Sequence, residues 1–344
     1  MFTRMLVPLD GSERAERALP VAARLAQALD GTLILLRVVQ PPLQMATPLA
    51  PPLRVETEIL AEHIEAANTY LARVAQELDQ ASLKYEKTAL AGYPAEMTLE
   101  AVHSSRADVI VLCSHGRTGL LRWALGSVAQ RVVHQASVPV LVLPAQGATL
   151  AEDAQRPLRV MVPLDGSWLA EAALGPAATL VSALAQQGQG TVHLVQVVRH
   201  LAPSTGSEKD APALPGARGA GYLEAQDYLS RTAEHLNTGP LASLQVQVTW
   251  SVVVDKDVAG ALVDLAQGGK TAQGAAHAGH FDVIAMATHG RGGLHRWVMG
   301  SNTERVLSAA RLPLLVIRPK EVVVTSRFDA NPSEHEFTVQ AQKG

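Results

Sequence analysis

Two closely similar phrases contain the residue types that most often hold phosphate. Residues 113–127 read CSHGRTGLLRWALGS, and residues 287–301 read ATHGRGGLHRWVMGS. Each phrase follows a short apolar run and ends in a Gly-Ser pair where a helical pattern begins. A glycine-containing loop between a strand and a helix presents backbone N–H groups, and the helix dipole makes that end positive. The two phrases therefore predict two phosphate-binding loops.

A second repeated motif places a carboxylate beside each loop. The sequence VPLDGS occurs at 7–12 and again at 162–167, each time at the end of an apolar run. In open parallel sheets, ligands bind beyond the carboxyl ends of the strands. Asp10 and Asp165 could there accept hydrogen bonds from ribose hydroxyls. The alternative is that each aspartate only caps the turn before the next helix.

The elements that would position these residues form two copies of one unit. LILLRVV at 33–39 returns as VHLVQVV at 192–198, and the ending SVPVLVLP at 137–144 returns as RLPLLVIRP at 311–319. Short Val/Ile/Leu runs alternating with helical stretches are typical of a parallel sheet covered by helices. We expect an α/β fold of two tandem doubly wound domains, each with a five-stranded, mostly parallel sheet in the order 3-2-1-4-5.

The first copy defines the expected elements, and the repeat defines the expected domains. Strands are predicted at 4–9, 32–39, 84–90, 108–113 and 138–143, and helices at 13–29, 56–80, 95–105 and 127–136. The predicted organisation is domain one at 1–145, a linker at 146–157, domain two at 158–320 with insertions near 203–221 and 268–280, and a tail at 321–344.

Composition narrows the class of protein. Of 344 residues, 47% are hydrophobic and 18% are charged, which is enough apolar material for two cores. A net charge of −3 gives no basic field for nucleic acid. Cys113 is the only cysteine, so no intramolecular disulfide is possible. No apolar run approaches the roughly 20 residues of a membrane span, and the chain begins without a signal-peptide pattern. We expect a cytoplasmic protein that binds neither membrane nor nucleic acid.

The spacing of the glycines carries a family resemblance. ATP-binding universal stress proteins have the pattern Gly-x-x-Gly, nine residues, then Gly-Ser or Gly-Thr. Here Gly116 and Gly290 are each followed by nine residues and then by Gly126-Ser127 and Gly300-Ser301. Together with the VPLDGS and SVPVLVLP motifs, the chain resembles a tandem universal stress protein over roughly 1–145 and 157–320. The resemblance implies ATP as the ligand, with Mg²⁺ or Mn²⁺ accompanying it.

The resemblance also implies which residues form the two sites. Asp10 and Asp165 would approach the adenosine, and Val38 and Val197 would lie against adenine. The complete candidate set is Pro8, Asp10, Val38, Cys113, Gly116, Arg117, Gly126, Ser127 and Val128 in copy one, and Pro163, Asp165, Val197, Ala287, Gly290, Arg291, Gly300, Ser301 and Asn302 in copy two.

One departure from the family pattern concerns its first glycine, which is Cys113 in copy one and Ala287 in copy two. If that position required a positive φ, a side chain there would cost roughly 1–2 kcal/mol. If it required only close approach of the ligand, a small side chain would be tolerated, and we favour this account. Copy two also lacks the Gly-x-Pro turn found at 92–94, so the first site is the better supported.

Several residues have a structural interpretation beside a functional one. His115 and His289 are interpreted as loop-shaping residues and not as general bases. Cys113 is interpreted as a small apolar residue and not as a redox sensor. Ser127 and Ser301 could serve as helix N-caps, and Arg117 and Arg291 could face solvent or an interface instead of phosphate.

The resulting functional hypothesis is a nucleotide-responsive regulatory or stress-resistance protein. A slow ATPase is an alternative, although no Gly-Lys-Ser/Thr motif is present. A scaffold that has lost its nucleotide is another. In the family, the terminal strands meet across a pseudo-twofold axis, so we expect the strands near Pro139–Leu143 and Pro313–Ile317 to pair within the chain. Homodimerisation is also expected.

Overall fold

The computed structural model describes residues 2–41, 53–114, 125–144, 150, 157–185, 190–199, 219–268, 280–289 and 299–319, with the backbone alone for 53–57. The predicted linker, both insertions and the tail lie largely outside these residues. So do Gly116, Arg117, Gly290 and Arg291 of the candidate set.

Ten strands form a single sheet. They are β1 (Arg4–Leu9), β2 (Thr32–Val39), β3 (Lys84–Ala91), β4 (Val109–Cys113), β5 (Val140–Leu143), β6 (Leu158–Pro163), β7 (Gly190–Val198), β8 (Gln247–Val254), β9 (Val283–Ala287) and β10 (Leu314–Ile317). Their order across the sheet is β3-β2-β1-β4-β5-β10-β9-β6-β7-β8. We call the part up to β5 the first half and the part from β6 the second half. Each half has the expected order 3-2-1-4-5.

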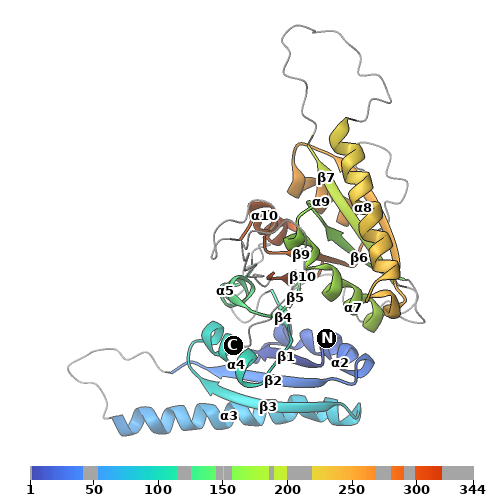
Figure 1. Ribbon diagram of the computed structural model, residues 1–344. Coiled ribbons are helices and arrows are strands. Elements are labelled where there is room, and N and C mark those ends of the chain that lie inside the picture. Colours follow the sequence, from blue (N-terminus) through green and yellow to red (C-terminus); the bar gives the residue numbers. More distant parts are fainter. Residues whose placement is uncertain are drawn as a thin grey trace, which may run out of the picture.

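The two halves meet through their last strands. Leu141 of β5 lies opposite Leu315 of β10 in an antiparallel pair, whereas every other strand pair in the described sheet is parallel. Figure 1 shows β5 and β10 between the two groups of strands and helices. The expected pairing of the terminal strands within one chain is therefore confirmed.

Helices cover both faces of the sheet. They are α1 (Glu13–Glu16), α2 (Ala18–Ala28), α3 (Leu53–Gln80), α4 (Pro94–Ser104), α5 (Ser127–Gln135), α6 (Trp168–Glu171), α7 (Leu174–Leu184), α8 (Ala220–Thr238), α9 (Val258–Ala266) and α10 (Ser301–Ala309). Buried residues of α1, α2, α3, α7 and α8 share one apolar cluster, and those of α4, α5, α9 and α10 share the other. Each cluster contains residues of both halves, so each core runs across the β5–β10 junction.

The prediction of one helix over 13–29 was wrong in one respect, because the helix is interrupted at Arg17 between α1 and α2. Pro20 lies in the first turn of α2 and has no N–H with which to reach the Glu16 carbonyl. Pro176 occupies the first turn of α7, where α6 and α7 are interrupted in the same way. The interruption is thus a feature of both copies.

Candidate functional site

A cleft of about 660 Å³ lies in the first half, at the carboxyl ends of β1, β2 and β4 and the beginning of α5. It is lined by all seven candidate residues of copy one that the structure describes, namely Pro8, Asp10, Val38, Cys113, Gly126, Ser127 and Val128. The strand order reverses between β1 and β4, which is where open α/β sheets bind ligands. The volume is that of a typical small-molecule site.

Asp10 forms one corner of the cleft and also organises its own turn. Its Oδ1 accepts hydrogen bonds from the Ser12 N–H (3.0 Å) and the Ser12 hydroxyl (2.6 Å). Ser12 in turn caps α1 by accepting from the Ala15 N–H at 3.2 Å. Asp10 therefore does cap this turn. Because the same side chain lines the cleft, capping and ligand contact are compatible roles.

The beginning of α5 forms the opposite, electropositive end. Gly126 is the N-cap and makes no side-chain cap, and Ser127 is the first helical residue, so the interpretation of Ser127 as an N-cap was wrong. The first intrahelical bond runs from the Gln130 N–H to the Gly126 carbonyl at 2.8 Å. The N–H groups that precede it, including those of Ser127 and Val128, therefore point out of the helix start. This is the arrangement that binds phosphate in many proteins.

Cys113 lies in the apolar wall of the cleft. Burial raises the pKa of its thiol to about 12, and the nearby Asp10 carboxylate adds to the rise, opposed by Arg17. The thiol is therefore protonated at neutral pH, which supports the interpretation of Cys113 as a small apolar residue. Cys113 and Ala287 both lie in strands and neither has a positive φ. A side chain at this position is thus not strained, and only its size matters to a ligand.

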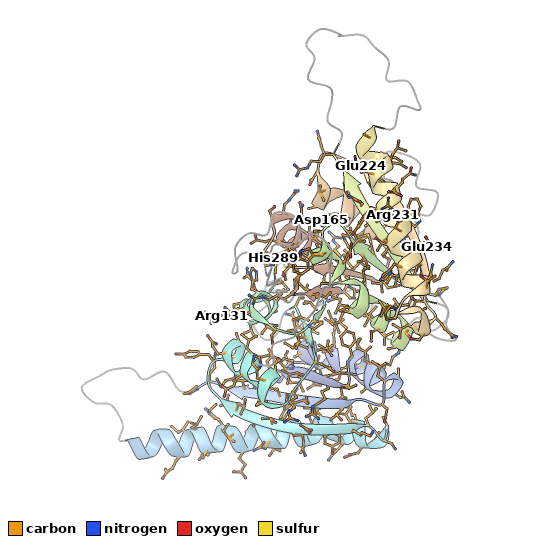
Figure 2. The ribbon with its side chains drawn as sticks, viewed as in Figure 1. Arg131, Asp165, Glu224, Arg231, Glu234 and His289 are labelled. Atoms are coloured by element: carbon orange, nitrogen blue, oxygen red, sulfur yellow. The ribbon has the colours of Figure 1, made fainter. Side chains whose placement is uncertain are left out.

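The second half repeats the same arrangement at the ends of β6, β7 and β9. Asp165 accepts from the Ser167 N–H (3.0 Å) and hydroxyl (2.6 Å), as Asp10 does from Ser12. Gly300 is the N-cap of α10 without a side-chain cap, and Ser301 is its first residue, so Ser301 is not an N-cap either. The remaining candidates are Pro163 in β6, Val197 in β7, Ala287 in β9 and Asn302 in α10. Figure 2 labels Asp165 and His289, which both belong to this half.

His289 makes a local hydrogen bond, as the structural interpretation expected. Its Nδ1 lies 2.8 Å from the hydroxyl of the adjacent Thr288. Thr288 also binds the start of α10, because its carbonyl accepts from the Gly300 N–H at 2.9 Å. His289 thus belongs to the loop that leads to α10. His115, its counterpart in copy one, lies outside the described residues.

The sequence analysis missed many of the residues that line the cleft, and two of them have side chains that contact each other. Arg37 of β2 and Tyr70 of α3 line it, and the Arg37 guanidinium carbon lies 5.7 Å from the centre of the Tyr70 ring. A signal for Tyr70 was available, since the helical pattern around it recurs at Tyr228. Arg37 gives no such signal, because Gln196 stands at the matching place in copy two.

The described parts of the chain contain no group of three or more His, Cys, Asp or Glu residues that could hold a metal ion. Among the described helices, none is long and apolar enough to cross a membrane.

Comparison with known proteins identifies the family. The model of the universal stress protein family matches residues 1–144 and again residues 158–318. A universal stress protein of Methanocaldococcus jannaschii is 31% identical over 143 residues, which are 42% of this chain and 82% of that protein. One of Mycobacterium tuberculosis is 31% identical over 218 residues, which are 62% of this chain and 63% of that protein, so the match spans less than two thirds of its length.

A solved structure agrees on the fold. A universal stress protein from Archaeoglobus fulgidus has a TM-score of 0.63 at 20% identity and covers 92% of this chain and 99% of its own. A universal stress protein solved in complex with cAMP covers 42% of this chain and 98% of its own, at 21% identity and a TM-score of 0.30. Since the family model matches most of the sequence in two successive segments, this chain belongs to the universal stress protein family as a tandem member.

Proposed function

We propose that the chain binds an adenine nucleotide in the first-half cleft and acts as a nucleotide-responsive regulatory protein in stress resistance. The observation that carries this proposal is the composition of the cleft. It combines a carboxylate at Asp10, an apolar wall at Val38 and Cys113, and the uncapped beginning of α5. The carboxylate could accept hydrogen bonds from the ribose, the apolar wall could contact the base, and the uncapped beginning of α5 could bind the phosphates of a nucleotide.

The energies are adequate for a useful affinity. Hydrogen bonds to a charged group contribute about 1.5–3 kcal/mol each. Micromolar binding needs about 8 kcal/mol. A few such bonds from the start of α5, together with burial of the base against Val38, would reach that value. Mg²⁺ or Mn²⁺ would bind through the phosphates.

We propose a second site at the matching residues of the second half. It rests on the repeated Asp165 turn and the uncapped beginning of α10. Binding at either site would regulate an interface only if the ligand binds one conformation more tightly than another. A homodimer is the simplest assembly in which such an interface would exist.

Calorimetric titration with MgATP tests the proposal on the wild type, Gly126→Asp and Gly300→Asp. Gly126 has φ −60° and ψ 152°, and Gly300 has φ −61° and ψ 139°, conformations that any residue adopts. A Cβ on Gly300 would lie 3.3 Å from the Thr288 carbonyl oxygen, a close contact that the aspartate and alanine variants share. Aspartate is also a good N-cap, so it would occupy the open N–H groups with its own carboxylate and repel phosphate without unfolding the helix. Gly126→Ala and Gly300→Ala are the matched controls, because alanine cannot cap.

Two binding events that disappear one at a time with the two aspartate variants, and persist in the alanine controls, are the expected result. Ligand at 100 times Kd should also stabilise the fold by about 2.7 kcal/mol. A wild type that neither titrates nor shifts its melting temperature would support the scaffold alternative instead. Turnover well above roughly 1 s⁻¹ that is lost in Asp10→Ala would show an enzyme.

A further inference from the structure

We propose that the residue following β2 or β7 selects the base of the bound nucleotide, so that the two halves prefer different purines. Gln40 would read adenine in the first half, and Arg199, together with Asp255, would read guanine in the second half. The inference rests on the proposed function and names the ligand class of each site. It is carried by the place of these residues at the strand ends and by the hydrogen-bonding groups that they present.

Gln40 lies where the base would be bound in the first half. It directly follows the last residue of β2, it is exposed, and it lines the cleft together with Val38. Alternate residues of an extended chain face the same side, and the residue before a proline, here Pro41, favours an extended backbone. Gln40 therefore continues the face of β2 on which Val38 would contact the base.

Arg199 occupies the matching place in the second half. The repeat that aligns Val38 with Val197 aligns Gln40 with Arg199, and both of the latter are exposed directly after their strands. Val38 and Val197 pack against the same apolar cluster, so the two strands present the same face to it. The two halves therefore hold an amide and a guanidinium at equivalent points.

The second half also places a carboxylate next to this strand end. The Asp255 N–H donates to the carbonyl of Val198, the residue before Arg199, at 3.1 Å. The Asp255 Oδ1 accepts from the Asp257 N–H at 2.8 Å, which holds the side chain close to the start of α9. In the first half the same backbone bond, at 2.9 Å, runs from Gly92 to the last residue of β2, and glycine offers no side-chain acceptor.

The helix that follows Asp255 matches one that borders the first-half cleft. Pro94 and Thr98, in the first turns of α4, line that cleft. The matching helix of the second half is α9, and Asp255 lies two residues before its N-cap. We therefore place Arg199 and Asp255 at the edge of a base that lies against Val197.

The two sets of groups match different purines. A glutamine amide accepts from the adenine N6 amino group and donates to N7, whereas an arginine fork donates to both O6 and N7 of guanine. A carboxylate accepts hydrogen bonds only, and guanine offers it the N1–H and the N2 amino group on the adjoining edge. Adenine would instead direct its N6 amino group at Arg199 and its N1 acceptor at Asp255. These mismatched groups would lose their hydrogen bonds, which lowers the affinity.

The second half is tested by calorimetric titration of the full chain carrying Gly126→Asp, which silences the first site, with MgGTP and with MgATP. We expect MgGTP to bind about tenfold more tightly, a ratio that one bidentate base contact can supply. Arg199→Gln should remove this preference. Arg199→Lys is the control for charge, because it keeps the attraction to phosphate and loses the fork, so it should lower the ratio of the two affinities as well. Asp255→Asn keeps an acceptor for the turn and should reduce the preference.

The first half is tested in the Gly300→Asp background, where only the first site remains. MgATP should bind about tenfold more tightly than MgGTP. Gln40→Arg should shift the preference toward MgGTP, and Gln40→Ala, which removes both base contacts, should make the two affinities similar. Because Gln40 is exposed, neither replacement should change the melting temperature of the ligand-free chain.

Equal affinities for MgATP and MgGTP in either background, or ratios that Gln40→Ala and Arg199→Gln leave unchanged, would overturn the inference while leaving nucleotide binding intact. Binding of neither nucleotide to the Gly126→Asp chain, with MgATP still bound in the Gly300→Asp background, would overturn the assignment of the second half. A wild type that binds neither nucleotide would instead overturn the proposed function.

Discussion

The two halves share one topology but hold matching positions by different contacts. Before α4, the chain turns at Gly92, with a φ of +150°, and Pro94 begins the helix. Before α9, Asp257 caps the helix by accepting from the Gly260 N–H and pairs with Arg305 at 2.7 and 2.8 Å. A glycine turn thus precedes one of these two matching helices, and a charged cap begins the other. The apolar pattern fixes the architecture, and local polar contacts can be exchanged around it.

Matching positions in the sheets of the two halves also make different contacts. Ile34 of β2 lies beside Glu86 of β3, whose carboxylate pairs with Arg4 at 2.8 Å. The second half has a buried histidine at the matching place. His193 contacts the hydroxyls of Thr249 and Ser251, each at 2.8 Å, and its ring lies 5.2 Å from that of Phe281. A polar side chain is accommodated in this core because the neighbouring strand supplies hydroxyl partners.

The largest expected effect concerns the thiol that only the first site carries. With its pKa raised from about 9 to about 12, Cys113 should be alkylated by iodoacetamide about a thousandfold more slowly than an ordinary thiol at pH 7.5, since the thiolate is the reactive form. Intact-protein mass spectrometry measures the rate. Ala287→Cys in a Cys113→Ala background places a thiol at the matching strand end of the other half. Similar protection there would show equivalent sites, and rapid alkylation there would show that the second site is more open.

A smaller effect tests whether the halves unfold together. Leu71 of α3 and Leu229 of α8 are matching residues, both fully buried in the same apolar cluster. Leu→Ala at either position should cost about 2–5 kcal/mol. Because each core crosses the β5–β10 junction, both variants should lower the midpoint of a single unfolding transition in urea. Two transitions, each moved by only one of the variants, would contradict a shared core.

The smallest expected effect is a pH dependence confined to the second half. The hydrogen bond from Arg305, with help from the Gly260 N–H, lowers the pKa of Asp257 to about 2. A lowered carboxyl pKa stabilises the fold above the ordinary value near 3.9, and that contribution is lost as the pH falls toward 2. Asp257→Asn should therefore melt below the wild type at pH 6, and the difference should shrink between pH 4 and pH 2.

The matched control for that measurement is Glu96→Gln, which removes the Glu96–Arg131 ion pair between α4 and α5 of the first half. Glu96 and Arg131 are each about half exposed, so this pair should contribute little at any pH. A Glu96→Gln variant with the same pH profile as Asp257→Asn would show that the cap adds nothing beyond a surface ion pair.

Most strand positions were predictable because buried parallel strands read as continuous apolar runs. The expected strand at 138–143 is shorter in the structure, where pairing begins at Val140, since Pro139 has no N–H to donate. The turn at Asp10 could be predicted from the VPLDGS motif. The place of Arg37 in the cleft could not be inferred, because it depends on α3 packing over β2, a contact between residues distant in the sequence. The recurrence of Tyr70 at Tyr228 marks a repeated helix position but does not show that contact.

The antiparallel β5–β10 junction also means that the sheet of the first half gains its last neighbour only after the second half has been synthesised. During synthesis, β5 leaves the ribosome well before β10, and its four buried apolar residues form an edge strand with no neighbour on one side. An uncovered edge of that kind pairs readily with other chains. The second half therefore covers this edge of the first half, and we expect the edge to stay uncovered during translation until β10 has been synthesised.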